Sequence, residues 1–221
     1  MPTSTVEDYV KAVFSLQRES DSDEATVAGL ATRLNVTRGT VTAMVKKLRE
    51  SGLVDAERYG GVRLTSEGRK LAVKMVRRHR LVEVFLVDVL GFDWSEVHEE
   101  AEQLEHAMSE KLMGRLDEYL GHPSIDPHGD PIPDAEGKIA DPAGRPLSEF
   151  EQDETVTVNR IRDQEPEFLD FVATNGLRPS AVVQIRSVVQ AAESVTVQAE
   201  GFSDVTLSFA AAEKILVTSA D

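Results

Sequence analysis

The feature that most constrains the fold is a run of helix, turn, helix and hairpin that begins near residue 25. The stretch VAGLATRL has helical periodicity and stops at Asn35, after which Thr37 can cap a second helix from Arg38 to about Glu50. The sequence GLVDAERYGGVRLTSEG then predicts a strand, a Gly-Gly turn, a second strand and the start of another helix. Two short helices followed by a β-hairpin form the pattern of a winged helix-turn-helix.

Charge is distributed unevenly along the chain. The 221 residues carry a net charge of -15 at pH 7, which on average opposes binding to phosphate. Residues 25–80 nevertheless hold 13 Lys and Arg against 4 Asp and Glu, whereas the chain from Leu81 onward is strongly acidic. This asymmetry indicates a basic nucleic-acid recognition module attached to an acidic body that binds a cation. The alternatives are an accidental bias of surface charge and, for the fold, an ordinary helical hairpin beside a surface β-hairpin.

Helical periodicity continues on both sides of the basic segment. A first helix extends to about Arg18, and a long amphipathic helix covers Ser66 to about Leu90. Two shorter helices follow, one ending near Met108 and one from Lys111 to Leu120. Helices of this kind suit a dimer interface.

The character of the sequence changes after residue 120. A stretch rich in Pro, Gly and Asp predicts a loop or linker that ends near Pro146. The remainder contains runs of β-branched residues such as VTVNRI, AVVQIRSVV and SVTVQAE, with one short helix near Pro166 to Thr174. We expect a small domain resembling a β-barrel there.

Composition excludes several classes of site. The chain has no cysteine, so disulfides, iron–sulfur clusters, thiolate metal sites and thiol redox sensing are excluded. The start lacks the basic and apolar regions of a signal peptide, and no apolar run approaches the ~18 residues of a membrane span. We therefore expect a soluble cytoplasmic protein.

Histidine and carboxylate residues gather on two of the expected helices. His79 and Glu83 are four residues apart on the long helix and share one face. Four further residues of the next helix fall within an arc of about 100°: His98, Glu102, Glu105 and His106. Imidazole and carboxylate without thiolate suit Mn, Fe, Zn or Ni, and an oxygen-rich set favours Mn. The alternative is a solvated acidic helix face with surface ion pairs, and the loop residues His122 and His128 are expected to play no such part.

At this point the sequence resembles the diphtheria toxin repressor family of metal-dependent transcriptional regulators, including its manganese-responsive branch. The resemblance covers nearly the whole chain and is carried by VEDYVKAVF, TRGTVTAMVKKLRESGLV, YGGVRLTSEGRKLA, RRHRLVEVFL, VHEEAEQLEHAMS and DPHGDPIP. It implies a mainly α fold with a small β domain. The implied parts are a winged helix-turn-helix at 1–73, a helical metal-binding and dimerisation domain with a Pro-rich linker at 74–146, and an SH3-like (FeoA-like) β-barrel at 147–221.

The resemblance also implies two metal ions per subunit. The regulatory site would comprise Asp8, Glu102, Glu105 and His106, and the ancillary site His79, Glu83 and His98. In three-domain relatives the C-terminal domain adds Glu and Gln to the ancillary site, and Gln164 and Glu167 fall at that spacing, with Glu165 as a spare. Lys11 stands where small manganese sensors carry a bridging Glu, which favours two separated sites.

Metal preference follows from two of these positions. Iron-responsive members usually carry Met and Cys where this chain has Asp8 and Glu102, and hard carboxylates disfavour soft metals. We expect Mn(II), with Fe(II) or Co(II) as alternatives.

The implied function is that of a homodimeric repressor that binds a pseudo-palindromic operator in double-stranded DNA and is not an enzyme. Mn(II) would fix the dimer geometry and thereby control manganese uptake genes. The expected DNA contacts lie on the two helices and the wing: Arg33, Thr37, Arg38, Gly39, Thr40, Thr42, Lys46, Lys47, Arg49, Arg58 and Arg63. The alternatives are an Fe(II)-dependent repressor of iron uptake, a winged-helix sensor of an organic ligand and, from another class, a di-metal enzyme.

Overall fold

The computed structural model describes residues 3–20, 22–56, 60–141 and 143–220. The chain divides into two compact units. The first comprises Met1–His79 with Pro133–Lys138, and the second comprises Arg80–Ile132 with Ile139–Asp221. No helix within the described residues combines the length and the apolar character needed to cross a membrane.

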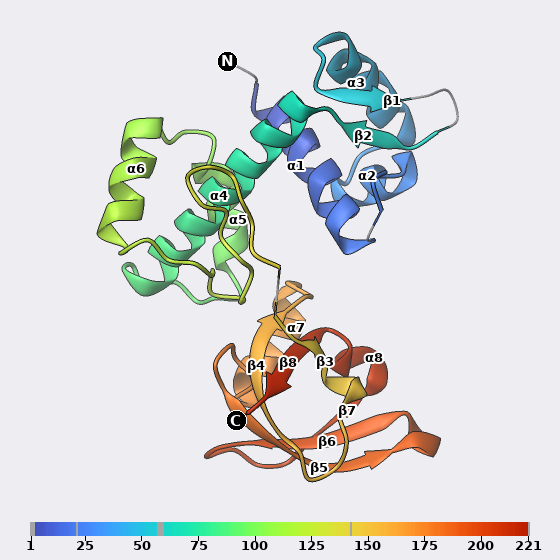
Figure 1. Cartoon of the computed structure of the whole chain (residues 1–221), viewed down its shortest axis with the longest axis vertical. Coiled ribbons are helices and arrows are strands. Elements are labelled where there is room, and N and C mark those ends of the chain that lie inside the picture. Colours follow the sequence, from blue (N-terminus) through green and yellow to red (C-terminus); the bar gives the residue numbers. More distant parts are fainter. Residues whose placement is uncertain (1–2, 21, 57–59, 142, 221) are drawn as a thin grey trace. The chain divides into compact units, whose positions relative to one another are not determined.

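The first unit contains the winged helix-turn-helix that the sequence predicts (Figure 1). Its elements are α1 (Ser4–Glu19), α2 (Val27–Arg33), α3 (Arg38–Glu50), β1 (Val54–Ala56), β2 (Val62–Leu64) and the first part of α4 (Ser66–Asp88). Thr26 and Thr37 cap α2 and α3, because each side chain accepts a hydrogen bond from the backbone N–H three residues on. The buried residues Phe14, Leu30 and Leu48 of the three helices form part of its core.

Strands β1 and β2 form the antiparallel hairpin of the wing. The register pairs Val54 with Leu64, Asp55 with Arg63 and Ala56 with Val62. An isolated bridge between Ala25 and Val62 adds the residue before the cap of α2 to this hairpin. The wing is therefore held to the start of the helix-turn-helix by backbone hydrogen bonds as well as by side chains.

The helical part of the second unit is built from the end of α4, α5 (Val97–Leu104) and α6 (Glu110–Tyr119). Their apolar faces share a core that includes Leu81, Val97 and Met113. Helix α5 is shorter than expected, since it begins at Val97 and ends at Leu104 rather than near Met108. Glu105 is the C-cap residue of α5, and His106 lies in the turn beyond it. Helical spacing therefore relates His98 to Glu102 but does not extend to His106.

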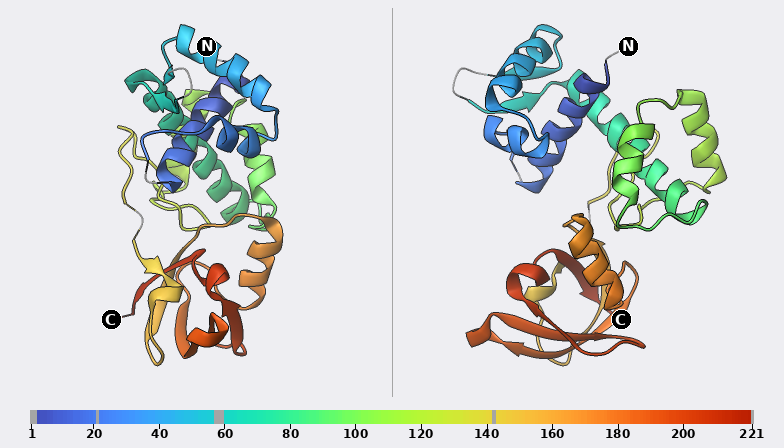
Figure 2. Two further views of the ribbon diagram at one scale, coloured as in Figure 1. Left: turned by 90° about the vertical axis from the view of Figure 1, so that its right-hand side faces the viewer. Right: turned by 180° about the vertical axis from the view of Figure 1, so that it is seen from behind.

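The C-terminal part of the second unit is a six-stranded antiparallel sheet with two small helices (Figure 2). In chain order its elements are β3 (Arg145–Pro146), β4 (Thr155–Ile161), α7 (Pro166–Thr174), β5 (Val182–Val189), β6 (Ser194–Ala199), β7 (Val205–Ser208), α8 (Phe209–Ala212) and β8 (Ile215–Ser219). Short 3-10 turns cover Leu147–Glu149 and Gln190–Ala192. The strand order is β3-β8-β4-β5-β6-β7.

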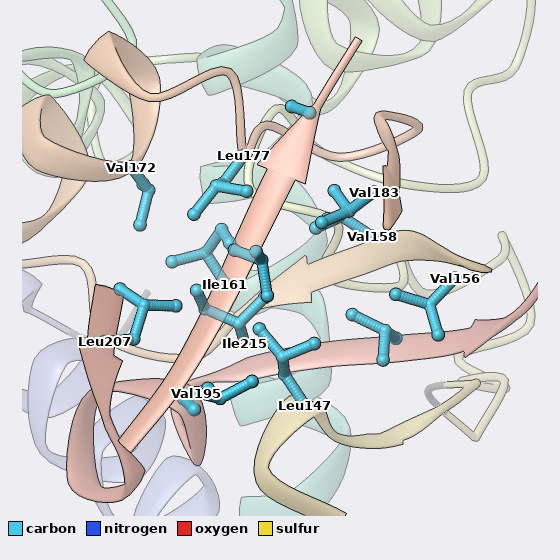
Figure 3. Close-up of a cluster of buried hydrophobic side chains, with 14 of the residues drawn as sticks. Leu147, Val156, Val158, Ile161, Val172, Leu177, Val183, Val195, Leu207 and Ile215 are labelled. Atoms are coloured by element: carbon cyan, nitrogen blue, oxygen red, sulfur yellow. The ribbon is translucent and has the colours of Figure 1, made fainter. Parts of the chain in front are cut away.

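The expected SH3-like domain is confirmed, and its described strands form an open sheet, not a closed barrel. Among the described strands, β3 and β7 form the two ends of the sheet and do not pair with each other. Strand β3 has only two residues and pairs only with β8, so it is too short to close the sheet. The concave face is instead filled by β-branched and leucine side chains, among them Val158, Ile161 and Leu207 (Figure 3).

Candidate functional site

A buried carboxylate on α4 contacts a histidine of α5 in the second unit. Glu83 is 1% exposed, and its Oε1 lies 3.3 Å from Nδ1 of His98. The other ring nitrogen of His98 lies 3.6 Å from Oε1 of Glu102, one turn further along α5. A buried carboxylate is costly unless a cation or hydrogen-bond donors compensate it, so this arrangement suits a bound cation.

His79 precedes Glu83 by one turn of the same continuous helix, as the sequence predicts. Both side chains are buried, and the one-turn spacing puts them on the same face of α4. Within the first unit, Nδ1 of His79 lies 3.4 Å from Nζ of Lys11. Lys11 therefore places a positive charge near His79.

The end of α5 gathers a second set of donor atoms. Glu102, Glu105 and His106 each offer one ligand atom within 4.8 Å of those of the other two. Glu105 is fully buried, and its Oε1 lies 3.5 Å from Nε2 of His106. Two carboxylates and an imidazole form an oxygen-rich set that suits Mn(II) or Fe(II). Asp8 lies on α1 in the first unit, and its part in this set stays a prediction.

The structure reveals a third set that the sequence reasoning missed. Glu83, Asp126 and His128 are all buried, and each offers a ligand atom within 4.8 Å of the other two. Asp126 accepts hydrogen bonds from the backbone N–H groups of His128 and Asp130, at 2.9 Å each. This turn orients the Asp-Pro-His segment inward, and the Asp-x-His spacing was the sequence signal that could have revealed it.

The ring of His128 is oriented in a way that suits a ligand. Its Nε2 lies 2.9 Å from the carbonyl oxygen of Trp94, and the two rings stack at 5.4 Å. Because a carbonyl only accepts, Nε2 carries a hydrogen, and in the neutral ring Nδ1 then presents a lone pair. Nδ1 is buried and has no hydrogen-bond partner among the described residues. A histidine held by a carbonyl on one nitrogen is a common arrangement in metal sites.

Burial is the largest influence on the pKa of Asp126. Burial raises the pKa of this carboxyl well above its usual range, and the neighbouring Asp130 and Glu83 raise it further. Arg80 opposes the increase, with Nε 3.5 Å from Asp126 and Nη2 2.9 Å from Asp130. A bound divalent cation would favour the ionised carboxylate at this position.

The loop at 126–130 also joins the helical part of the second unit to the β sheet. Asp130 forms an ion pair with Arg160 of β4 at 2.8 Å, and His128 O accepts from Ile161 N at 2.9 Å. Gln164, an expected ligand, donates its amide hydrogen to Asp130 at 3.2 Å. Glu165 and Glu167 are exposed and belong to none of the three sets found in the described residues. Their role as ligands stays a prediction.

The expected DNA-contacting face of α3 is exposed and polar. Thr37, Arg38, Gly39, Thr40 and Thr42 are exposed at its N-terminal end, while Val41, Val45 and Leu48 are buried beneath them. Lys46, Lys47 and Arg49 are exposed further along the helix. Because buried and exposed residues alternate in this way, the hydroxyl and basic side chains of α3 face solvent, as the side chains of a recognition helix that enters the major groove of DNA do.

Three arginines outside α3 differ in their surroundings. Arg33 forms an ion pair with Glu19, and Arg63 forms one with Glu24. Arg58 lies outside the described residues. Both described arginines therefore already contact a carboxylate in the DNA-free protein.

Comparison with known families agrees with the three-part reading of the chain. Residues 1–62 match the iron dependent repressor N-terminal DNA binding domain, and residues 65–134 match the iron dependent repressor metal binding and dimerisation domain. Residues 145–219 match the FeoA domain. The family descriptions thus assign DNA binding to the segment that contains the helix-turn-helix, and metal binding with dimerisation to the helical part that contains the His and Glu sets.

Full-length relatives extend this agreement. The chain is 31% identical over 236 residues to the iron-dependent repressor IdeR of Mycobacterium leprae, covering 96% of both chains. A solved manganese-dependent transcriptional repressor in complex with manganese is 40% identical, with a TM-score of 0.87 over 97% of this chain and 100% of that chain. The structure of IdeR from T. acidophilum is 32% identical, with a TM-score of 0.77 over 100% of both chains. The chain therefore belongs to the family of metal-dependent, DNA-binding transcriptional repressors that includes IdeR and the diphtheria toxin repressor.

Proposed function

We propose that the protein is a Mn(II)-activated repressor that controls manganese uptake genes from the cytoplasm, as a homodimer on a pseudo-palindromic operator. The observation that carries this proposal is the donor set of Glu102, the buried Glu105 and His106 at the end of α5. With Asp8, this set offers three carboxylates and one imidazole and no sulfur, which favours Mn(II) over softer metals. The similarity to a manganese-dependent repressor supports the same choice.

The switch in this proposal depends on Asp8. This residue lies on α1, whose other face packs in the DNA-binding unit, whereas Glu102, Glu105 and His106 belong to the second unit. Carboxylates that share one site repel one another when no cation is bound. Asp8, Glu102, Glu105 and His106 would together hold a Mn(II) ion, whose charge would offset this repulsion and link the DNA-binding unit to the second unit. The dimer then presents its two α3 helices at a fixed separation, which favours the DNA-binding state.

The experiment that tests this proposal measures metal-dependent DNA binding. The operator is first selected from a random duplex library with the Mn(II)-loaded protein. Fluorescence anisotropy of the labelled operator is then followed during anaerobic titration with Mn(II), Fe(II), Co(II) and Zn(II). We expect wild-type binding to rise with Mn(II), and the Asp8→Met/Glu102→Cys variant to shift its response towards Fe(II) or Co(II).

A matched variant controls for the introduced sulfur. Glu7→Met/Glu99→Cys adds the same two residue types to α1 and α5, one and three positions away from the proposed ligands. This variant should respond to metals as the wild type does. DNA binding that ignores every metal would contradict the proposal, as would an equal metal shift in both double variants.

We infer that the second ion binds at Glu83, which two overlapping sets share. The family resemblance selects His79 and His98 as its partners, whereas the buried Nδ1 of His128 and the carboxylate of Asp126 favour the loop at 126–130. Equilibrium dialysis with Mn(II) separates the two alternatives. If the loop supplies the ligands, His128→Gln loses one ion per subunit and His98→Gln keeps both, and the reverse result selects His98.

A further inference from the structure

Glu24, in the connection between α1 and α2, holds the wing through two contacts at once. Its Oε2 accepts a hydrogen bond from the backbone N–H of Gly61 at 3.2 Å, and its Oε1 forms an ion pair with the guanidinium of Arg63. The next residue, Ala25, exchanges both backbone hydrogen bonds with Val62, at 2.8 and 2.9 Å. The carboxylate thus lies beside a direct backbone connection between the helix-turn-helix and the wing.

Glu24 contacts the backbone of the wing at Gly61 in addition to the charged side chain of Arg63. A Cβ at Gly61 would overlap both Oε2 and Cβ of Glu24, so the Glu24 side chain lies directly against this glycine. The Arg63 and Glu24 side chains are 60% and 39% exposed, and an ion pair at that exposure alone would bring little stability. We therefore expect Glu24 to affect the position of the wing and of the Arg63 side chain more than the stability of the fold.

Arg63 is a residue that sequence reasoning places on a DNA phosphate. An arginine that contacts phosphate displaces condensed counterions and makes affinity fall with salt. An arginine already paired with a carboxylate contributes less to this sequence-independent attraction, because its charge is offset. Glu24 thus acts against the part of the affinity that does not depend on DNA sequence.

We propose that Glu24 is a positioning residue for DNA recognition, which fixes the wing at Gly61 and withholds Arg63 from the phosphate backbone. The consequence is a larger ratio of operator binding to non-specific binding than a free Arg63 would allow. This proposal rests on the DNA-binding function of the first unit. It predicts that a residue outside both the recognition helix and the wing controls specificity.

The test measures the salt dependence of DNA affinity at saturating Mn(II). Binding to the selected operator and to an unrelated duplex is measured between about 50 and 200 mM salt for wild type, Glu24→Gln, Arg63→Gln and the double variant. In Glu24→Gln, the slope of log K against log salt should steepen by about 0.9 for each subunit. Affinity for the unrelated duplex should rise about threefold or more at the lowest salt, with a smaller gain on the operator.

Two further variants separate the proposal from general charge effects. Glu67→Gln, which removes an exposed carboxylate paired with Lys70, changes the net charge equally and should leave the slope at the wild-type value. Arg63→Gln alone should also leave the slope nearly unchanged, and in the double variant it should cancel the effect of Glu24→Gln. The Arg63→Gln result stands even if Glu24→Gln fails to fold.

Two results of the salt titrations would overturn the proposal: an unchanged slope in folded Glu24→Gln, or a slope reduced by about 0.9 per subunit in Arg63→Gln. The second result would mean that Arg63 already contacts phosphate. Amide hydrogen exchange at Gly61 gives a readout without DNA, and it should be faster in Glu24→Gln than in wild type. If the wild type binds no DNA with any metal, the proposed repressor function is wrong. Amide exchange at Gly61 that is equal in Glu24→Gln and wild type would instead overturn the positioning role of Glu24 alone.

Discussion

Replacing Gly129 by alanine should loosen the junction between the metal-site loop and the β sheet. Gly129 has φ +87, and an added Cβ would overlap the carbonyl oxygen of Asn159 and lie 2.8 Å from Cα of Arg160. The left-handed backbone conformation costs alanine about 1–2 kcal/mol. The loop must also move away from β4, which weakens the hydrogen bond from Ile161 N to His128 O, worth about 1 kcal/mol. We expect a total loss of about 2–3 kcal/mol, the sum of the backbone cost and the weakened hydrogen bond.

Equilibrium unfolding in guanidinium chloride measures this loss. Trp94 is the one tryptophan of the chain and stacks on His128, so its fluorescence reports on this junction directly. The matched control is Gly91→Ala, at φ +73 with no heavy atom within 4 Å of the added Cβ. The control should lose only the backbone contribution of about 1–2 kcal/mol. Equal losses in the two variants would refute the argument that the close approach to β4 holds the loop in place.

Three further predictions concern single side chains. Thr37→Ala removes the cap that accepts from Thr40 N and should destabilise α3 by about 1 kcal/mol, measured as a lower free energy of unfolding. Gly114→Ala in α6 adds a Cβ with no atom within 4 Å and should stabilise the protein by about 0.5–1 kcal/mol. Burial raises the pKa of Asp126 above its value in the unfolded chain, so the metal-free folded state binds one more proton than the unfolded state does. The free energy of unfolding should therefore fall as pH rises from about 4 through the folded pKa. Asp126→Asn should abolish that loss.

The winged helix-turn-helix could be predicted from sequence because its signals are local. Thr37 caps α3 as expected, and the Gly-Gly turn lies between the two strands of the hairpin. The open sheet of the C-terminal domain could not be predicted, because closure depends on which distant strands pair. The register between two-residue β3 and β8 is such a long-range contact, and no periodicity within either strand encodes it.

The candidate site was predictable where it lies on helices and unpredictable where it lies in a loop. Spacing along α4 and α5 predicts that Glu83 and His98 can converge between the two helices, and Oε1 of Glu83 lies 3.3 Å from Nδ1 of His98. Their role as metal ligands stays a prediction. His128 was assigned no role because the conformation of a Pro- and Gly-rich loop does not follow from periodicity. Its inward orientation depends on the turn made by Asp126 and on the carbonyl of Trp94, which is distant in sequence.

The central claim is that metal and DNA act on one equilibrium between two states of the protein. If so, operator DNA must raise the affinity for Mn(II) by the same factor by which Mn(II) raises the affinity for the operator. Free Mn(II) is measured by electron paramagnetic resonance during titration of the protein with and without saturating operator. The account predicts equal factors for wild type and a loss of the coupling in Asp8→Asn. A Mn(II) affinity that operator DNA leaves unchanged would contradict it.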